Sequence, residues 1–238
     1  MKKTKLSKYY KNSQEMLNVQ NIFKDVENLT AKLIEVGLSS QQNFPTLNKL
    51  SQNISEISYA NSSDLSIALK NVAYQDIYDE LDRGKNYNIK MIDGALIQLL
   101  YRFQGSQLLS HRLAFFSSPY LESFQNEPEL YEEDEIFADI IDKNIVAVPI
   151  RFDYDPDNFQ EIHHPRCHLT LGQFKNCRIP VSSPLTPSIF IAFILRNFYN
   201  TAYHLYSEQI NFNNQRFPET ITEIETNILH FAIKSPSL

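Results

Sequence analysis

The sequence predicts an α+β fold in which a central antiparallel sheet, a meander plus a hairpin, is flanked by N-terminal and C-terminal helices. Three observations predict it. Apolar residues recur at spacings of three and four near both ends of the chain, and they alternate with polar residues in the middle. Turn dipeptides such as Asp93-Gly94 and Gly105-Ser106 separate the alternating segments. No repeat or low-complexity linker interrupts the chain, so we expect one domain over residues 1–238.

Residues 1–84 are predicted to form a helical N-terminal layer. Apolar residues lie on one helical face over 13–36, and Gly37 ends the pattern. A second amphipathic helix is expected over 63–81, closed by Arg83-Gly84. The segment 41–60 between them is polar and only weakly patterned.

Residues 85–182 are predicted to form the sheet core. Alternation indicates strands at 87–91, 95–103 and 109–116, which would form the meander, and at 145–155 and 167–172, which would form the hairpin. An insert over 119–143 carries nine acids and no lysine or arginine from residue 121 to 142, and we expect short surface helices there.

Residues 183–238 are predicted to form C-terminal helices. Pro184 and Pro187 introduce an apolar, aromatic helix over 188–209, and Pro218 opens a last amphipathic helix that runs through Phe231. The aromatic spacing in the first of these helices is typical of core packing.

Composition narrows the function classes. Two cysteines cannot build a disulfide framework and no secretory signal is apparent, so we expect a cytoplasmic protein. The longest apolar run, 189–195, is too short to span a membrane. Five glycines leave no phosphate-binding glycine loop. The net charge of −6 argues against a broad nucleic-acid surface, but the acidic insert accounts for more than all of it, which leaves room for a local phosphate-facing cleft.

The hairpin carries the residues with the clearest chemistry. Strand alternation places Arg151, Asp153 and Asp155 on one face of the first strand. It places His168 and Thr170 on one face of the second strand. A symmetric antiparallel register sets Asp153 opposite His168, so that polar residues face polar residues.

A carboxylate beside an imidazole is an arrangement suited to acid/base catalysis. We therefore predict Asp153, His168, Arg151 and the loop residue His164 as catalytic. Three further residues would bind the substrate, with the arginines stabilising phosphate charge: Arg112, Arg178 and Thr170. The competing interpretation is a structural hairpin whose arginines and aspartates pair with one another in solvent.

The same residues also allow a second interpretation, in which the site depends on a metal ion. Asp153 and Asp155, with or without Asp93, could hold Mg²⁺ for phosphodiester hydrolysis, because hard cations favour carboxylate oxygens. Asp93-Gly94 is explained more simply by turn chemistry. His164 and His168 have a zinc-like separation, but a zinc ion there would have to bridge a loop and a strand.

Three sequence blocks carry a family resemblance: R-F-D-Y-D at 151–155, H-P-x-x-H-L-T-L-G at 164–172 and C-R-I-P-V at 177–181. Over about residues 65–199 the chain resembles an uncharacterised bacterial family, a domain of unknown function. Families of this kind often lie among mobile or phage-defence genes. The chain is also similar, more weakly, to small toxin-like proteins with a D-G strand, an R-[FY]-D strand and a histidine-rich segment, which implies nucleic-acid chemistry.

Two functional hypotheses follow. The first is a bacterial phage-defence or toxin-type protein that cleaves nucleic-acid phosphodiesters, and it requires the Asp153 and His168 side chains to lie within a water-bridged distance. The second is a non-catalytic subunit of a multi-protein defence complex, in which the acidic insert and the N-terminal helix bind protein partners.

Overall fold

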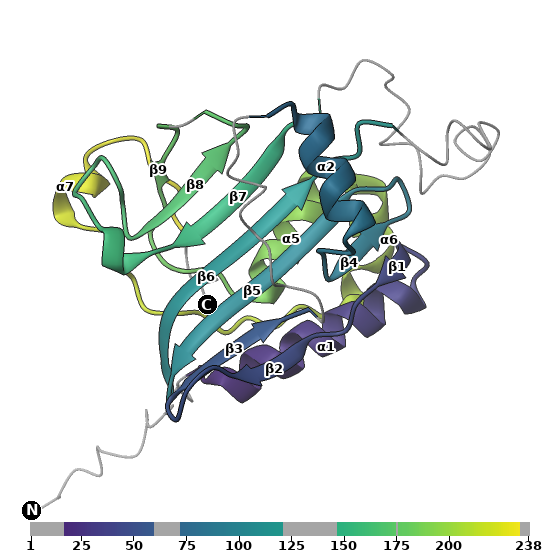
Figure 1. Ribbon diagram of the computed structural model, residues 1–238, viewed down its shortest axis with the longest axis horizontal. Coiled ribbons are helices and arrows are strands. Elements are labelled where there is room, and N and C mark those ends of the chain that lie inside the picture. Colours follow the sequence, from purple (N-terminus) through teal and green to yellow (C-terminus); the bar gives the residue numbers. More distant parts are fainter. Residues whose placement is uncertain (1–16, 60–71, 121–146, 175, 234–238) are drawn as a thin grey trace, which may run out of the picture.

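One antiparallel sheet organises the chain (Figure 1). The structure, a computed structural model, describes residues 17–59, 72–120, 147–174 and 176–233. The main strand order is β1-β4-β5-β6-β7-β8-β9, and β3 pairs with both β2 and β5. The strands are β1 (Ser39–Gln42), β2 (Thr46–Lys49), β3 (Ile54–Ser58), β4 (Ile89–Met91), β5 (Leu96–Gln104), β6 (Gln107–Phe116), β7 (Pro149–Tyr154), β8 (Cys167–Leu171) and β9 (Ile179–Pro180).

Helices lie on both faces of this sheet, which confirms the α+β class. They are α1 (Val19–Glu35), α2 (Tyr74–Arg83), α5 (Pro187–Phe198), α6 (Asn200–Ile210) and α7 (Glu223–Thr226), with a 3-10 turn at Pro156–Asn158. Local sequence sets their starts: Asn18 accepts two backbone N–H bonds at the start of α1, and Thr186 caps α5 just before Pro187. Among the described residues, no helix is both long enough and apolar enough to cross a membrane.

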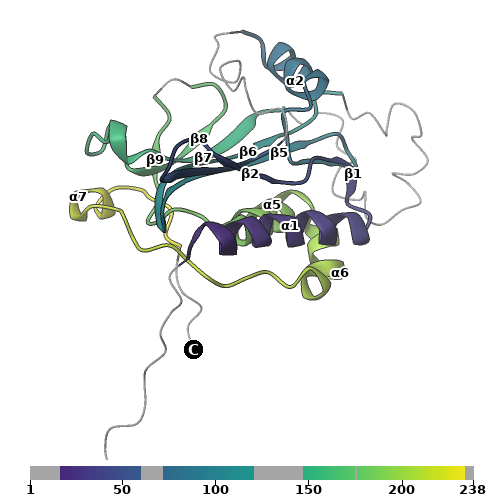
Figure 2. The same ribbon diagram turned by 60° about the horizontal axis from the view of Figure 1, so that its bottom comes forward.

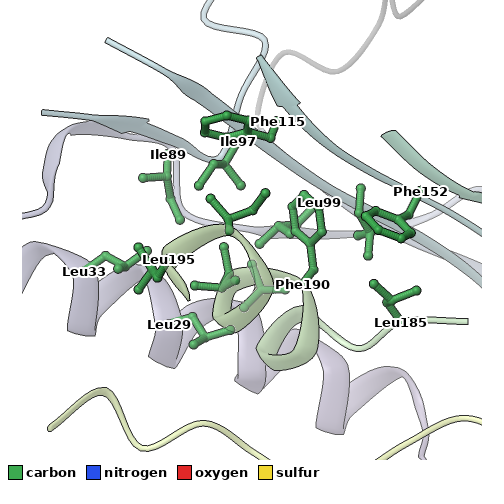
Figure 3. Close-up of a cluster of buried hydrophobic side chains, with 14 of the residues drawn as sticks. Leu29, Leu33, Ile89, Ile97, Leu99, Phe115, Phe152, Leu185, Phe190 and Leu195 are labelled. Atoms are coloured by element: carbon green, nitrogen blue, oxygen red, sulfur yellow. The ribbon is translucent and has the colours of Figure 1, made fainter. Parts of the chain in front are cut away.

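The main core lies between the sheet and three helices. Helices α1, α5 and α6 lie along the same face, as Figure 2 shows. Leu29 and Leu33 of α1 meet Phe190 and Leu195 of α5 beneath the sheet residue Leu99 (Figure 3). Such buried apolar packing is the main source of folding free energy.

The opposite face is covered only in part by α2. Ile77 and Leu81 of this helix pack against Leu96, Ala114 and Phe116 at one end of β5 and β6. The residues that continue this face along β6, β7 and β8 are the charged and polar ones. The packing of α2 therefore leaves the functional candidates outside the apolar core.

The sequence prediction was wrong about part of the N-terminal layer. Residues 1–84 contribute strands β1, β2 and β3 to the sheet as well as helices. These strands are polar, half-buried or exposed over much of their length, so they lack the alternation that reveals a strand. Helix α2 begins at Tyr74, because Ala73 is extended with ψ 145° and Val72 is non-helical. The earlier part of the expected helix, 60–71, lies outside the described residues, as does the acidic insert over 121–146.

The C-terminal helices also differ from the prediction. The helix expected over 188–209 breaks at Tyr199, which has φ −137° and ψ 54°. Its buried side chain donates a hydroxyl hydrogen bond to Asp93, with both carboxylate oxygens at 2.8 Å, and this tertiary contact favours the break. The last helix is only the four-residue α7, and Phe231 instead forms a parallel bridge with Val181.

Candidate functional site

A row of paired residues crosses the open face of the sheet. Leu100 pairs with Arg112, Arg112 with Asp153, and Asp153 with His168, on strands β5 to β8. The predicted register of β7 and β8 is confirmed, with Arg151 opposite Thr170 and the Asp155 N–H bonded to the Arg166 carbonyl at 2.8 Å. This row forms the floor of a hollow.

The hollow has a volume of about 440 Å³, and we call it the arginine hollow. Its charged walls come from strands far apart in sequence. The charged and imidazole residues that line it are Glu56, Arg102, His111, Arg112, Arg151, Asp153, Asp155, His164, His168 and Arg178. It thus brings together every predicted site residue except Thr170, which lies beside Arg151 in the ladder but does not line the hollow.

Asp153 is held between two arginines. The Arg112 Nε donates to Oδ1 at 3.2 Å and the Arg151 Nε donates to Oδ2 at 2.5 Å. Burial acts to raise the pKa of this carboxyl, but the charges of the arginines and of His168 outweigh it, so the pKa lies below its ordinary value. Asp153 is therefore a fixed negative charge, although only 8% of the residue is exposed.

The arginines retain donors for another anion. Each guanidinium uses its Nε on Asp153, and within the described residues the terminal nitrogens of Arg112 and Arg151 bond to no other group. Arg178 also forms no ion pair with any described residue. Four arginines and three carboxylates line the hollow, so with neutral histidines its lining carries a net charge of +1.

The tautomer of His168 follows from its neighbours. Its Nδ1 lies 2.9 Å from the Pro165 carbonyl oxygen, which can only accept, so Nδ1 carries the proton. Burial lowers the pKa of His168 below its ordinary value, although Asp153 acts in the opposite direction. At neutral pH the imidazole is thus neutral, and its Nε2 atom, which carries the lone pair, lies 3.9 Å from Asp153 Oδ2. This atom is a base without a hydrogen bond to any described residue.

A second imidazole lies next to the first. The rings of His164 and His168 have centroids 4.8 Å apart in an edge-to-face arrangement. His164 Nε2 lies 4.0 Å from Asp155 Oδ2, which also accepts from Asn158. The loop that carries His164 is closed by two backbone bonds between Gln160 and His164. Each histidine therefore has its own aspartate.

A second hollow, lined by polar residues and Ile162, continues from the first. It has a volume of about 680 Å³ and shares His164 and Arg178 with the arginine hollow. Because three carboxamides line it, we call it the amide hollow. Its remaining walls are Asn158, Gln160, Ile162, His163 and Asn176. Glu225 of α7 supports this loop by accepting the Ile162 N–H at 3.4 Å.

The carboxylates of the arginine hollow are poorly suited to bind magnesium. Both oxygens of Asp153 already accept from arginines, whose charges oppose a divalent cation. Asp93 does not line either hollow: it closes its turn through the Ala95 N–H and accepts from Tyr199. Within the described ranges no three histidine, cysteine or acidic residues cluster as a metal site would require.

Sequence reasoning missed part of the walls. Glu56 and Arg102 form an ion pair at 2.6 Å, and Glu56 belongs to the unpredicted strand β3. Arg102 lies two residues after Leu100 and so points to the same face of β5, and this alternation could have predicted its position. His111 could not be found this way, because its Nε2 accepts the Leu185 N–H on the core side of the sheet.

Comparison with known proteins gives a family and no activity. The family model described as "Uncharacterized conserved protein (DUF2290)" matches residues 38–233, so the chain belongs to this family. A search of curated proteins finds no match. A search of solved structures finds none either.

Proposed function

We propose that this member of the DUF2290 family is a nucleic-acid phosphodiesterase that uses acid/base chemistry in the arginine hollow, and that it serves a bacterial defence or toxin-type role. A phosphodiester is the substrate class whose charge matches three arginines around one imidazole base. The observation that carries the proposal is the contact of His168 Nδ1 with the Pro165 carbonyl, which leaves Nε2 as the nitrogen of the neutral ring that can accept a proton in the hollow.

The roles divide by position. His168 accepts a proton from the attacking group, because its Nε2 is the free base in the hollow. Arg112 and Arg151 use their terminal nitrogens on the phosphate while Asp153 keeps both guanidiniums in place. Arg178 adds charge at the border with the amide hollow.

The acid/base version is preferred over the Mg²⁺ version. A metal site needs oxygens that are free to bind, whereas both Asp153 oxygens are engaged. Asp155 already accepts from Asn158 and would be the one remaining carboxylate of the predicted pair. We therefore expect activity to persist in EDTA.

The test is cleavage of labelled single-stranded and double-stranded RNA and DNA by the full chain, in Mg²⁺ and in EDTA. His168→Ala should lower the rate about 10²- to 10⁴-fold, the usual contribution of a general base. The matched control is His204→Ala, because His204 is exposed on α6 at the opposite face of the sheet. Circular dichroism confirms that each variant is folded.

Loss of cleavage in His168→Ala with full activity in His204→Ala supports the proposal. No cleavage of any substrate by folded wild-type protein overturns it and favours the non-catalytic subunit of a defence complex. Equal activity of the wild type and His168→Ala also overturns it, because the cleavage would then belong to another site or to a contaminant.

A further inference from the structure

We infer that the substrate of the arginine hollow is RNA, cleaved by its own 2′-hydroxyl group, with His168 as the base and His164 as the acid. This inference rests on the proposed function and adds the substrate class, the nucleophile and the second catalytic group. It follows from which side chains of the hollow already form hydrogen bonds or ion pairs with one another and which do not.

The nucleophile is the first argument. Both oxygens of Asp153 accept from arginines, and Asp155 lies beside His164, so His168 Nε2 is the group that activates the nucleophile. A ribose 2′-hydroxyl is held beside the phosphorus by the substrate itself, and such intramolecular attack has a large entropic advantage over attack by water. DNA offers no such group. One imidazole is therefore sufficient to activate the nucleophile in RNA.

The leaving group is the second argument. Cleavage expels a 5′-alkoxide, which needs a proton at the moment it forms. His164 lies next to His168, and its Nε2 is beside Asp155, a carboxylate that pairs with the imidazole when the ring is protonated. Two neighbouring imidazoles, one neutral and one with an anionic partner, provide a base and an acid at the same phosphate.

The reaction balances without a cofactor. His168 Nε2 takes the 2′-hydroxyl proton while the 2′-oxygen forms a bond to phosphorus. The bond from phosphorus to the 5′-oxygen breaks, and that oxygen takes a proton from His164. The products are a 2′,3′-cyclic phosphate and a 5′-hydroxyl, and proton exchange with solvent restores both histidines. Arg112 and Arg151 bind the charge that develops on the phosphorane oxygens.

The position of the amide hollow sets the orientation in which the RNA strand binds. It adjoins the first hollow at His164 and Arg178, where the leaving group departs, so the nucleotide on the 5′-hydroxyl side enters it. Its wall carries the carboxamides of Asn158, Gln160 and Asn176, which both donate and accept hydrogen bonds as base edges do.

The experiment uses three oligonucleotides of one sequence in EDTA: all RNA, all DNA, and DNA with a single ribonucleotide. We expect cleavage of the RNA, cleavage of the chimera only 3′ to its ribonucleotide, and intact DNA, with cyclic-phosphate ends seen by mass spectrometry. DNA cleaved as fast as RNA, or RNA products with 3′-hydroxyl ends, would overturn the inference and leave the phosphodiesterase standing. Failure to cleave all three would overturn both.

A sulfur substitution tests the acid separately. A 5′-bridging phosphorothiolate leaves as a thiolate that needs no proton, so it should restore His164→Ala to near the wild-type rate on that substrate. It should not restore His168→Ala. Equal defects of His164→Ala on both substrates would overturn the role of His164, since a merely structural residue would not respond to the leaving group.

Discussion

His168 Nε2 lies 3.9 Å from Asp153 Oδ2, on the neighbouring strands β8 and β7. The distance is too long for a hydrogen bond. While the imidazole is neutral, both atoms are also acceptors, so neither can donate to the other. When His168 gains a proton, the two groups become an ion pair. The carboxylate therefore stabilises the product of proton transfer without occupying the base beforehand.

The pH profile of cleavage should report this relationship. His168 must be neutral to act as a base, and burial holds its pKa below its ordinary value of 6.5, so the low-pH limb of the kcat/KM profile, on which the rate rises with pH, should have its midpoint below 6.5. Asp153 raises that pKa, so Asp153→Asn should shift the midpoint to lower pH. Rates of RNA cleavage from pH 4.5 to 8 measure both. A rising limb with its midpoint above pH 7 would contradict the assignment of His168 as the base.

Asp153→Asn should also destabilise the protein. The substitution removes the shared partner of two partly buried arginines. Breaking a fully buried ion pair lowers the free energy of unfolding by several kcal/mol, and because these guanidiniums reach the solvent-filled hollow we expect a loss of roughly 2 kcal/mol. An added anion can replace the lost charge, so sulfate should recover more stability in the variant than in the wild type.

Urea unfolding with sulfate and with chloride at equal ionic strength measures this difference. Glu80→Gln is the matched control, because its pair with Arg83 lies on α2 outside the hollow, Arg83 is 72% exposed, and an exposed pair contributes less than about 1 kcal/mol. Equal effects of sulfate on both variants would show that the arginine hollow has no special affinity for anions.

Sequence alone predicted the β7–β8 register because one face of each strand is polar and the other apolar. A shift by one residue would bury Arg151 and expose Phe152, which leaves the observed pairing as the natural choice. The meander was predicted for the same reason, with Asp93-Gly94 as its turn. Alternation therefore fixed the strands that form the floor of the site.

The rest depends on contacts that periodicity does not contain. The strands β1 to β3 are paired through backbone bonds and carry few buried side chains, so their sequences lack a strand pattern. The contact of Arg112 with Asp153 depends on the pairing of β6 and β7, which are joined by the acidic insert, and so could not be derived from sequence. The expected last helix failed although it is amphipathic, because Ile228 and Leu229 have no apolar surface to cover.

Tyr199→Phe should destabilise the fold without affecting the hollow. The Tyr199 hydroxyl donates to the buried Asp93 carboxyl, and removing it costs about 1–3 kcal/mol for a buried group left without its partner. Urea unfolding measures the change. Tyr203→Phe on α6 is the control, since its hydroxyl bonds to no described residue and should change stability little. Equal effects would mean that the Asp93 contact does not hold the break between α5 and α6.

His111 should make the fold sensitive to acid. Burial lowers the pKa of His111 to about 4, whereas an unfolded histidine titrates near 6.5. Between these values the unfolded state binds more protons, so the free energy of unfolding should fall as pH falls, by up to about 3 kcal/mol from this residue.

The geometry of the ring acts in the same direction as burial. His111 Nε2 accepts the Leu185 N–H at 3.1 Å, and a proton there would set two donors against each other. Urea unfolding of the wild type and His111→Gln at pH 7.5 and 4.5 measures the effect, because glutamine can accept the same bond but does not titrate. The wild type should lose more stability than His111→Gln over this interval, and Asp153 and His168, which also act on His111, are present in both. Equal losses would show that His111 is not the acid-sensitive group.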